Sequence, residues 1–91
     1  MSRCSYRVEI APAASRDLRK LERAAFDAAQ STILSLAIAP RPPGTRKLKG
    51  SERTFRIRLG PYRILYDVYD NEKLVVVFRV VRRKEATYRR S

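Results

Sequence analysis

One stretch decides the fold of this 91-residue chain, residues 54–69, which reads TFRIRLGPYRILYDVY. Apolar and basic side chains alternate over residues 55–59, and successive side chains of a β-strand point to opposite faces of its sheet. The alternation predicts a strand that turns its apolar side chains to a core and both Arg56 and Arg58 to the other face. The pair Gly60-Pro61 is typical of a turn, so the next residues are expected to return as an antiparallel strand.

Two guanidinium groups on one side of a rigid strand suit a phosphate, because each presents a planar fork of donors. The same alternation also fits an ordinary polar outer face, so the pattern alone does not choose. The formal net charge is +12, with 21 Lys and Arg against 9 Asp and Glu. A field of this strength attracts polyanions: nucleic acid first, an acidic protein second and an anionic membrane third. Without a long apolar run, the membrane is the weakest of the three.

The missing residue types restrict the chemistry. The chain has no histidine and a single cysteine, Cys4. It therefore has neither an intrachain disulfide nor a cysteine cluster for a metal, and we expect neither metal nor cofactor. Catalysis would have to use arginine, lysine, tyrosine or the few carboxylates. The N-terminus lacks an apolar stretch that resembles a signal peptide, so a cytoplasmic location is expected.

The first part of the chain predicts one strand and two helices. Residues 6–10 alternate as in an amphipathic strand. Pro12 suits the first turn of a helix, and apolar residues then recur at helical spacing over residues 13–25. A second helical pattern covers residues 26–38. Glu22 and Arg23 mark either a tight connection or a kink.

A breaker at residues 40–44, PRPPG, ends the helical part. Residues 45–51 then form a basic loop whose charge is expected to be solvated. Three strands come next in an antiparallel meander, at residues 54–59, 62–69 and 73–81. Residues 74–78 are continuously apolar, which predicts a strand at the centre of the sheet that is buried on both faces.

Together these elements predict a single α+β domain over residues 1–91, with the order β-α-α-β-β-β and a mainly antiparallel sheet. The first strand can return beside the third or the fourth strand. The helical hairpin would cover one face of the sheet and leave the other for a ligand. Arg56, Arg58 and Arg63 could converge on that free face.

Four segments of the chain carry a resemblance: residues 13–21 (AASRDLRKL), 47–50 (KLKG), 55–66 (FRIRLGPYRILY) and 78–89 (FRVVRRKEATYR). In this order they resemble the RelE/ParE superfamily of bacterial and archaeal toxins. The resemblance covers nearly the whole chain. The resemblance implies a small sheet flanked by a helical hairpin, and a toxin that is held inactive by a cognate antitoxin.

The resemblance also implies an activity. RelE-type members cleave messenger RNA in the ribosomal A site: a ribose 2′-hydroxyl attacks the adjacent phosphate and leaves a 2′,3′-cyclic phosphate. By similarity, Arg56 and Arg58 bind the phosphate and help to activate the hydroxyl, and Arg63 neutralises the transition state. Arg82 would protonate or stabilise the leaving oxygen, and Tyr88 would stack on a base or position it.

Two departures from the family pattern affect these roles. Some members have lysines where this chain has arginines, and arginine stays protonated and is a poor general base. Arg58 is then expected to stabilise charge, while Lys49 or a ribosomal group takes the proton. Many relatives have a histidine before the tail, where this chain has Arg82 or Arg83. The residues expected to bind RNA or the ribosome are Lys47, Lys49, Arg83, Lys84 and Arg89.

Three functions are therefore open to this chain. The first is a ribosome-dependent endoribonuclease toxin, with an acidic antitoxin, messenger RNA and the ribosome as its partners. The second is a ParE-like inhibitor of DNA gyrase without nuclease chemistry. The third is a degenerate member that only binds nucleic acid. Several arginines at nuclease positions favour the first.

Overall fold

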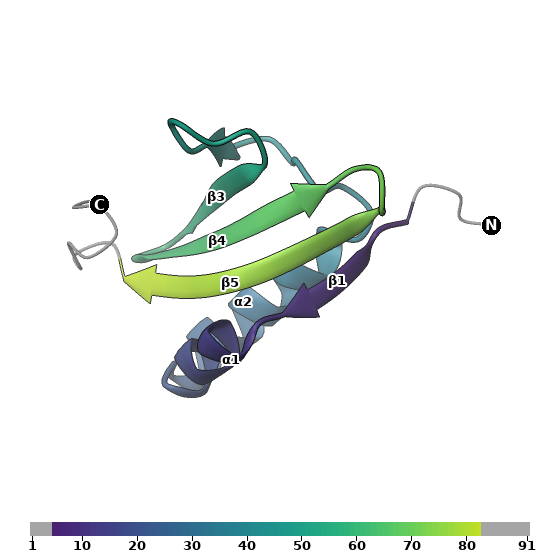
Figure 1. The fold of residues 1–91 in the computed structure, drawn as a ribbon. Helices are drawn as coiled ribbons and strands as arrows, with labels where there is room; N and C mark the ends of the chain where they lie inside the picture. Colours follow the sequence, from purple (N-terminus) through teal and green to yellow (C-terminus); the bar gives the residue numbers. More distant parts are fainter. Residues whose placement is uncertain (1–4, 83–91) are drawn as a thin grey trace.

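A computed structural model describes residues 5–82, and both of its helices lie on one face of a five-stranded sheet (Figure 1). The elements are β1 (Arg7–Ile10), α1 (Pro12–Arg19), α2 (Arg23–Ser35), β2 (Arg46–Lys47), β3 (Thr54–Leu59), β4 (Tyr62–Tyr69) and β5 (Leu74–Arg82). The predicted α+β architecture with a helical hairpin on one face is confirmed. The short β2, in the segment expected to be a solvated loop, was not predicted.

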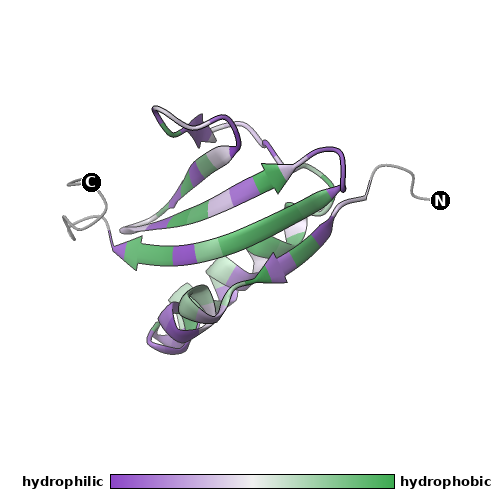
Figure 2. Ribbon diagram, in the orientation of Figure 1, coloured by the Kyte–Doolittle hydropathy of each residue, from purple (hydrophilic) through white to green (hydrophobic). Residues whose placement is uncertain are grey.

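The strands lie in the order β1-β5-β4-β3-β2. β1 runs parallel to β5, and the other pairs are antiparallel. The first strand therefore lies beside the last one, which was one of its two expected positions. The prediction for residues 74–78 is wrong, because β4 holds the centre of the sheet. Figure 2 shows β5 as almost wholly hydrophobic. Within residues 74–78, however, only Val75 and Val77 are fully buried, while Val76 and Phe78 are half-buried on the face without helices.

The first helix is shorter than the pattern predicted, and the second has the predicted length but begins and ends three residues earlier. Pro12 occupies the first turn as expected, but α1 ends at Arg19, and Glu22 is extended (φ −70°, ψ 165°) where α2 begins. The chain thus makes a tight connection over residues 20–22 and not a kink. No glycine or proline marks this break, so only packing on the sheet reveals it. Neither helix within residues 5–82 is long and apolar enough to cross a membrane.

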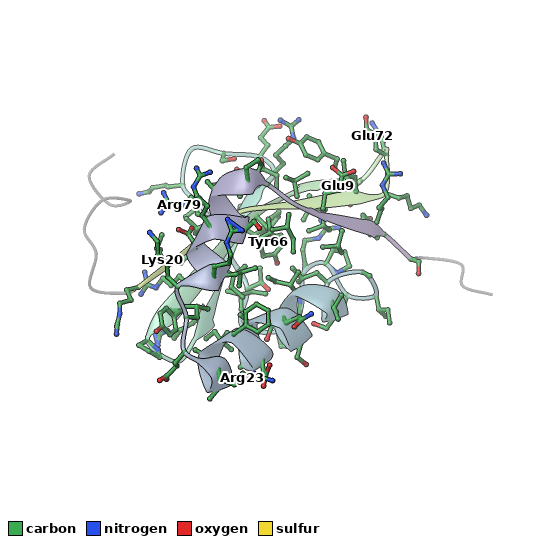
Figure 3. All side chains as sticks on the ribbon, turned by 90° about the horizontal axis from the view of Figure 1, so that it is seen from below. Glu9, Lys20, Arg23, Tyr66, Glu72 and Arg79 are labelled. Carbon is green, nitrogen blue, oxygen red and sulfur yellow. The ribbon has the colours of Figure 1, made fainter. Side chains whose placement is uncertain are left out.

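Tyr66 lies in the middle of the core between the sheet and the helices (Figure 3). Its side chain is fully buried, and its ring stacks on Phe55 with 6.0 Å between the centroids. Burial raises the pKa of the Tyr66 hydroxyl, which donates a hydrogen bond of 2.7 Å to the carbonyl oxygen of Pro40. The core residue therefore fixes the start of the connection from α2 to β2.

A second tie holds the same connection. The Arg41 guanidinium and the Tyr6 hydroxyl both donate to Oδ1 of Asp70, at 3.0 and 2.7 Å. The hydrogen bonds from Tyr6 and Arg41 lower the pKa of the Asp70 carboxyl. The Arg41 guanidinium also lies 5.7 Å from the ring centroid of Phe55. Three segments distant in sequence are joined there: the start of β1, the connection after α2 and the turn between β4 and β5.

Asp17 of α1 completes the edge of β5 where β1 stops. β1 pairs with β5 only as far as Val77, which leaves the next backbone groups of that edge without a strand partner. Oδ2 of Asp17 accepts the N–H of Val80 at 2.9 Å, and the carboxylate pairs with Arg79 at 2.7 and 3.2 Å. Figure 3 shows Arg79 beside α1. A side chain thus replaces the missing strand and satisfies a backbone donor.

Asp17→Asn is expected to destabilise the fold. Burial alone raises the pKa of Asp17, but the hydrogen bonds from Arg79 and Val80 and the charge of Arg79 outweigh it, so the pKa lies below its ordinary value. Hydrogen bonds to a charged group contribute about 1.5–3 kcal/mol. We expect a loss of that size in the free energy of unfolding at neutral pH, measured by urea denaturation.

The pH dependence tests the cause. A carboxyl whose pKa is lowered by folding stabilises the protein above its ordinary pKa, and this stabilisation is lost as the pH falls through the lowered value. The difference between wild type and Asp17→Asn should therefore shrink in acid. Asp27→Asn is the control, because Asp27 forms only an exposed ion pair of 3.4 Å with Arg23 and should cost less than about 0.5 kcal/mol. Equal losses in the two variants would contradict the role of Asp17.

Candidate phosphate-binding site

A cavity of about 370 Å³ opens beside β2, β3 and β4, and basic residues dominate its lining. Its lining residues are Pro43, Gly44, Arg46, Arg56, Ile57, Arg58 and Arg63. Among these residues, four are arginines and none is an acid. The core residues Ile57 and Ile64 face the helices, so the alternation of β3 and β4 directs the intervening arginines to the other face of the sheet.

Strand register brings the arginines together in pairs. Arg58 lies directly opposite Arg63 on the antiparallel strands β3 and β4. Arg46 lies directly opposite Arg56 on β2 and β3. The first register begins at the two-residue turn Gly60-Pro61, where Gly60 has φ +59°. This is the position that glycine takes in a type II′ hairpin.

Like charges directly opposite one another in a sheet repel, so an anion that binds between them is favourable. Asp67 lies on β4 but does not line the cavity; its Oδ1 accepts a hydrogen bond of 2.6 Å from the Thr54 hydroxyl. Its partner Thr54 in turn accepts from Ser51 at 2.7 Å. The Asp67 carboxylate thus binds Thr54 directly opposite it and holds together the ends of β3 and β4 that lie away from the Gly60-Pro61 turn. The cavity offers guanidinium donors to an anion from outside.

The structure places three predicted site residues in this cavity and moves a fourth away from it. Arg56, Arg58 and Arg63 line the cavity together. Arg82 does not, because it lies opposite Tyr62, with its guanidinium 5.3 Å from the Tyr62 ring centroid. Both side chains border a groove with Ala24 and Ala28 of α2, on the helix side of the sheet.

A β-bulge causes the displacement of Arg82. Tyr66 pairs with Val77 but Leu65 pairs with Arg79, so Phe78 is an extra residue in β5. One extra residue reverses which side chains face which side of a sheet. Unbulged alternation would have given Arg82 the same face as Arg63. Nothing in the local sequence marks the bulge.

Arg46 is the cavity residue that sequence reasoning missed. It lies in the segment that the sequence predicts to be a solvated loop, where Lys47 and Lys49 are the residues expected to bind RNA or the ribosome. Lys47 lies opposite Phe55, a residue packed against the core, and therefore points to the helix side of the sheet. Lys49 is exposed in the turn after β2 and does not line the cavity. The available signal was Gly50-Ser51, which is typical of a hairpin tip that would pair residues 46–47 with β3.

The remaining predicted residues lie outside the described part of the chain. These are Arg83, Lys84, Tyr88 and Arg89. Their roles stay predictions.

Comparison with known proteins now identifies the family. Residues 8–87 match the family described as the ParE toxin of type II toxin–antitoxin system, parDE. The chain belongs to the RelE/ParE superfamily of toxins. RelE1 of Methanocaldococcus jannaschii is 28% identical to this toxin over 84 residues, which cover 89% of this chain and 93% of that protein. The resemblance inferred from the sequence is confirmed.

Solved structures of the superfamily share the fold. The toxin–antitoxin complex RelBE2 from Mycobacterium tuberculosis contains a chain 31% identical to this toxin, with a TM-score of 0.77 and coverage of 89% of this chain and 94% of that one. The archaeal RelE–RelB complex from Pyrococcus horikoshii gives 28% identity and a TM-score of 0.80, with coverage of 90% and 99%. Both structures are complexes with an antitoxin.

Inorganic phosphate is expected to stabilise this toxin through the cavity. A ligand that binds only the folded state adds about 1.4 kcal/mol at a concentration about ten times its Kd. Thermal unfolding should therefore shift upward with phosphate in the wild type and less in Arg58→Ala. Arg19→Ala is the control, because it removes an equal charge from an exposed position on α1. Equal shifts in both variants would show that phosphate acts on net charge and not at the cavity.

Proposed function

We propose that this toxin is a ribosome-dependent endoribonuclease that cleaves messenger RNA in the A site and acts in the cytoplasm. The observation that carries the proposal is the cavity itself: four arginines from three adjacent strands line it, and none of the lining residues within residues 5–82 is a carboxylate. Such a site suits a phosphodiester, whose negative charge increases in the transition state of cleavage.

The proposed reaction needs no nucleophile from the protein. The ribose 2′-hydroxyl attacks the neighbouring phosphorus, the bond to the 5′-oxygen breaks, and a 2′,3′-cyclic phosphate is left. The protein orients the ribose and stabilises the doubly charged phosphorane. Arg58 and Arg63, directly opposite one another, would hold the phosphate that reacts, with Arg56 beside them on β3.

Proton transfer is the part that the arginines do not supply. Guanidinium groups remain protonated at neutral pH and act here as stabilisers of charge. Lys49 or a group of the ribosome would take the proton of the 2′-hydroxyl. For the leaving oxygen the sequence left Arg82 and Arg83 open, and the position of Arg82 on the helix side of the sheet favours Arg83. Tyr88 would stack on a base.

A second candidate function is inhibition of DNA gyrase. It is favoured by the family match itself, which is to the ParE toxin. In this case the basic face would bind a protein or DNA without cleaving a bond. The pairs of opposed arginines favour the nuclease, because like charges placed directly opposite one another suit a phosphodiester whose negative charge increases during cleavage.

An acidic antitoxin is the expected regulator of this toxin. The solved relatives are toxin–antitoxin complexes, and a net charge of +12 favours an acidic partner. We propose that the antitoxin covers the arginine cavity with an extended or helical segment. Its carboxylates would neutralise the opposed arginines, so that inhibition and substrate binding compete for the same groups.

Primer extension on translated messenger RNA tests the nuclease. Induction of the wild type should produce cuts within codons, and Arg58→Ala and Arg63→Ala should each reduce them about 100-fold or more, the usual effect of removing one donor to transition-state charge. Arg19→Ala is the matched control, because it removes the same side chain and charge from an exposed position on α1 that does not line the cavity.

The same experiment separates the alternatives. Growth arrest with intact messenger RNA and gyrase-dependent DNA breaks would refute the nuclease and support the gyrase inhibitor. Absence of toxicity would favour a member that only binds nucleic acid.

Antitoxin binding makes a separate prediction. Adding the antitoxin encoded beside the toxin should abolish the phosphate-dependent thermal shift, because its acidic side chains would occupy the arginine pairs. A crystal structure of the complex is the direct measurement. A complex in which the cavity stays uncovered would contradict this mode of inhibition.

A further inference from the structure

The cavity contains two pairs of opposed arginines, while cleavage of one phosphodiester accounts for only one of them. Arg58 and Arg63 form the pair nearer the Gly60-Pro61 turn, and Arg46 and Arg56 form the other. Both pairs line the same cavity. The second pair exists only because β2 adds itself to the outer edge of β3.

The spacing of the two pairs follows from sheet geometry. Arg56 and Arg58 are two residues apart on β3, which separates their positions by about 6.6 Å along the strand, while adjacent strands lie about 4.8 Å apart. One pair is centred between β2 and β3 and the other between β3 and β4, so their midpoints lie about 8 Å apart, offset across the sheet as well as along β3. This is slightly more than the distance between consecutive phosphates of an extended RNA strand, and the long arginine side chains can span the difference. A strand of RNA that crosses β3 obliquely would therefore bring a phosphate to each pair.

We propose that Arg46 and Arg56 form a second phosphate subsite, so that the cavity holds two consecutive phosphates of one RNA strand. Arg58 and Arg63 bind the phosphate that reacts, and the second pair binds its neighbour and fixes the register of the strand. This inference rests on the proposed function, since it takes the anion in the cavity to be RNA. Arg46 is therefore a positioning residue: it binds the neighbouring phosphate and thereby places the reacting one.

The surroundings of Arg46 support a fixed subsite. The N–H of Leu48 donates to the carbonyl oxygen of Thr54 at 2.9 Å, and the N–H of Thr45 donates to that of Pro42 at 3.1 Å. These bonds hold β2 on both sides of the arginine. The position where Gly44 would carry a Cβ atom has no other atom within 4 Å. No side chain therefore covers the rim of the cavity at Gly44, two residues before Arg46.

The chemical consequence is recognition of backbone and not of bases. Two contacts to successive phosphates fix where the strand lies and which phosphate meets the second arginine pair, but they carry no sequence information. Loss of Arg46 should therefore weaken binding and misalign the reacting phosphate, without a change in codon preference.

Binding of short oligonucleotides tests the subsite without cleavage. The probe is a trinucleotide with deoxyribose at each position, which lacks the attacking hydroxyl and has two internucleotide phosphates. Arg46→Ala should bind it about tenfold more weakly, the loss expected for one charge-assisted hydrogen-bonding contact. The slope of log K against log salt should fall by about 1. Arg19→Ala, which removes the same charge from an exposed position on α1, should retain most of the affinity.

A neutral probe decides whether Arg46 contacts the second phosphate. A methylphosphonate at one of the two phosphates should weaken binding by the wild type and by Arg19→Ala about tenfold, but should hardly affect Arg46→Ala, because the contact is already missing. Arg46→Lys should recover part of the sensitivity. Thermal unfolding of each variant confirms that it is folded.

Three results would overturn the inference. The first is an equal loss of affinity in Arg46→Ala and Arg19→Ala, the second is full sensitivity of Arg46→Ala to both methylphosphonates, and the third is no binding of the trinucleotide by the wild type at low salt. If the coupling is found but translated messenger RNA stays intact, the subsite stands and the nuclease function fails. If messenger RNA is cut but the coupling is absent, the nuclease function stands and the second phosphate subsite fails.

Discussion

Everything in the candidate site depends on the register between β3 and β4. A shift of one residue would turn both Arg56 and Arg58 toward the core and send their apolar neighbours to solvent, which the buried face forbids. The register is fixed at both ends of the hairpin. Gly60 permits the tight turn at one end, and at the other Thr54 donates to Asp67 directly opposite it. A rigid pair of strands can hold like charges close together, which a mobile loop would separate.

The core on the helix side supports the other wall of the cavity. Tyr66 is on β4, the central strand, and its hydroxyl reaches through the core to the carbonyl oxygen of Pro40. That bond and the pairing of Arg41 with Asp70 fix the connection that supplies Pro43 to the cavity. Packing on one face of the sheet therefore sets the geometry of the charged face. Of the residues that line the cavity, Ile57 is the one that also belongs to the core cluster.

Local pattern in the sequence predicted part of the fold, while features that depend on pairing between distant segments were missed. Alternation and the Gly60-Pro61 turn gave β3 and β4 with their observed bounds, and with them three of the four cavity arginines. Arg46 was missed because a two-residue strand has no periodicity of its own. Arg82 was displaced by a bulge that only the pairing of β4 with β5 reveals. The hydrogen bond from the N–H of Val80 to Asp17 joins residues 63 positions apart, and no local pattern in the sequence predicts such a contact.

The parallel pairing of β1 with β5 has a consequence for biosynthesis. The first strand of the described fold has the last one as its sheet neighbour, so β1 has no place to pair until β5 has been made. The helices share this dependence, because the apolar side chains of α1 and α2 pack on strands that come after them in the chain. Closing such long-range contacts is slow. Translation must therefore proceed through β5 before the nascent chain can complete the sheet and close the core beneath the arginine cavity.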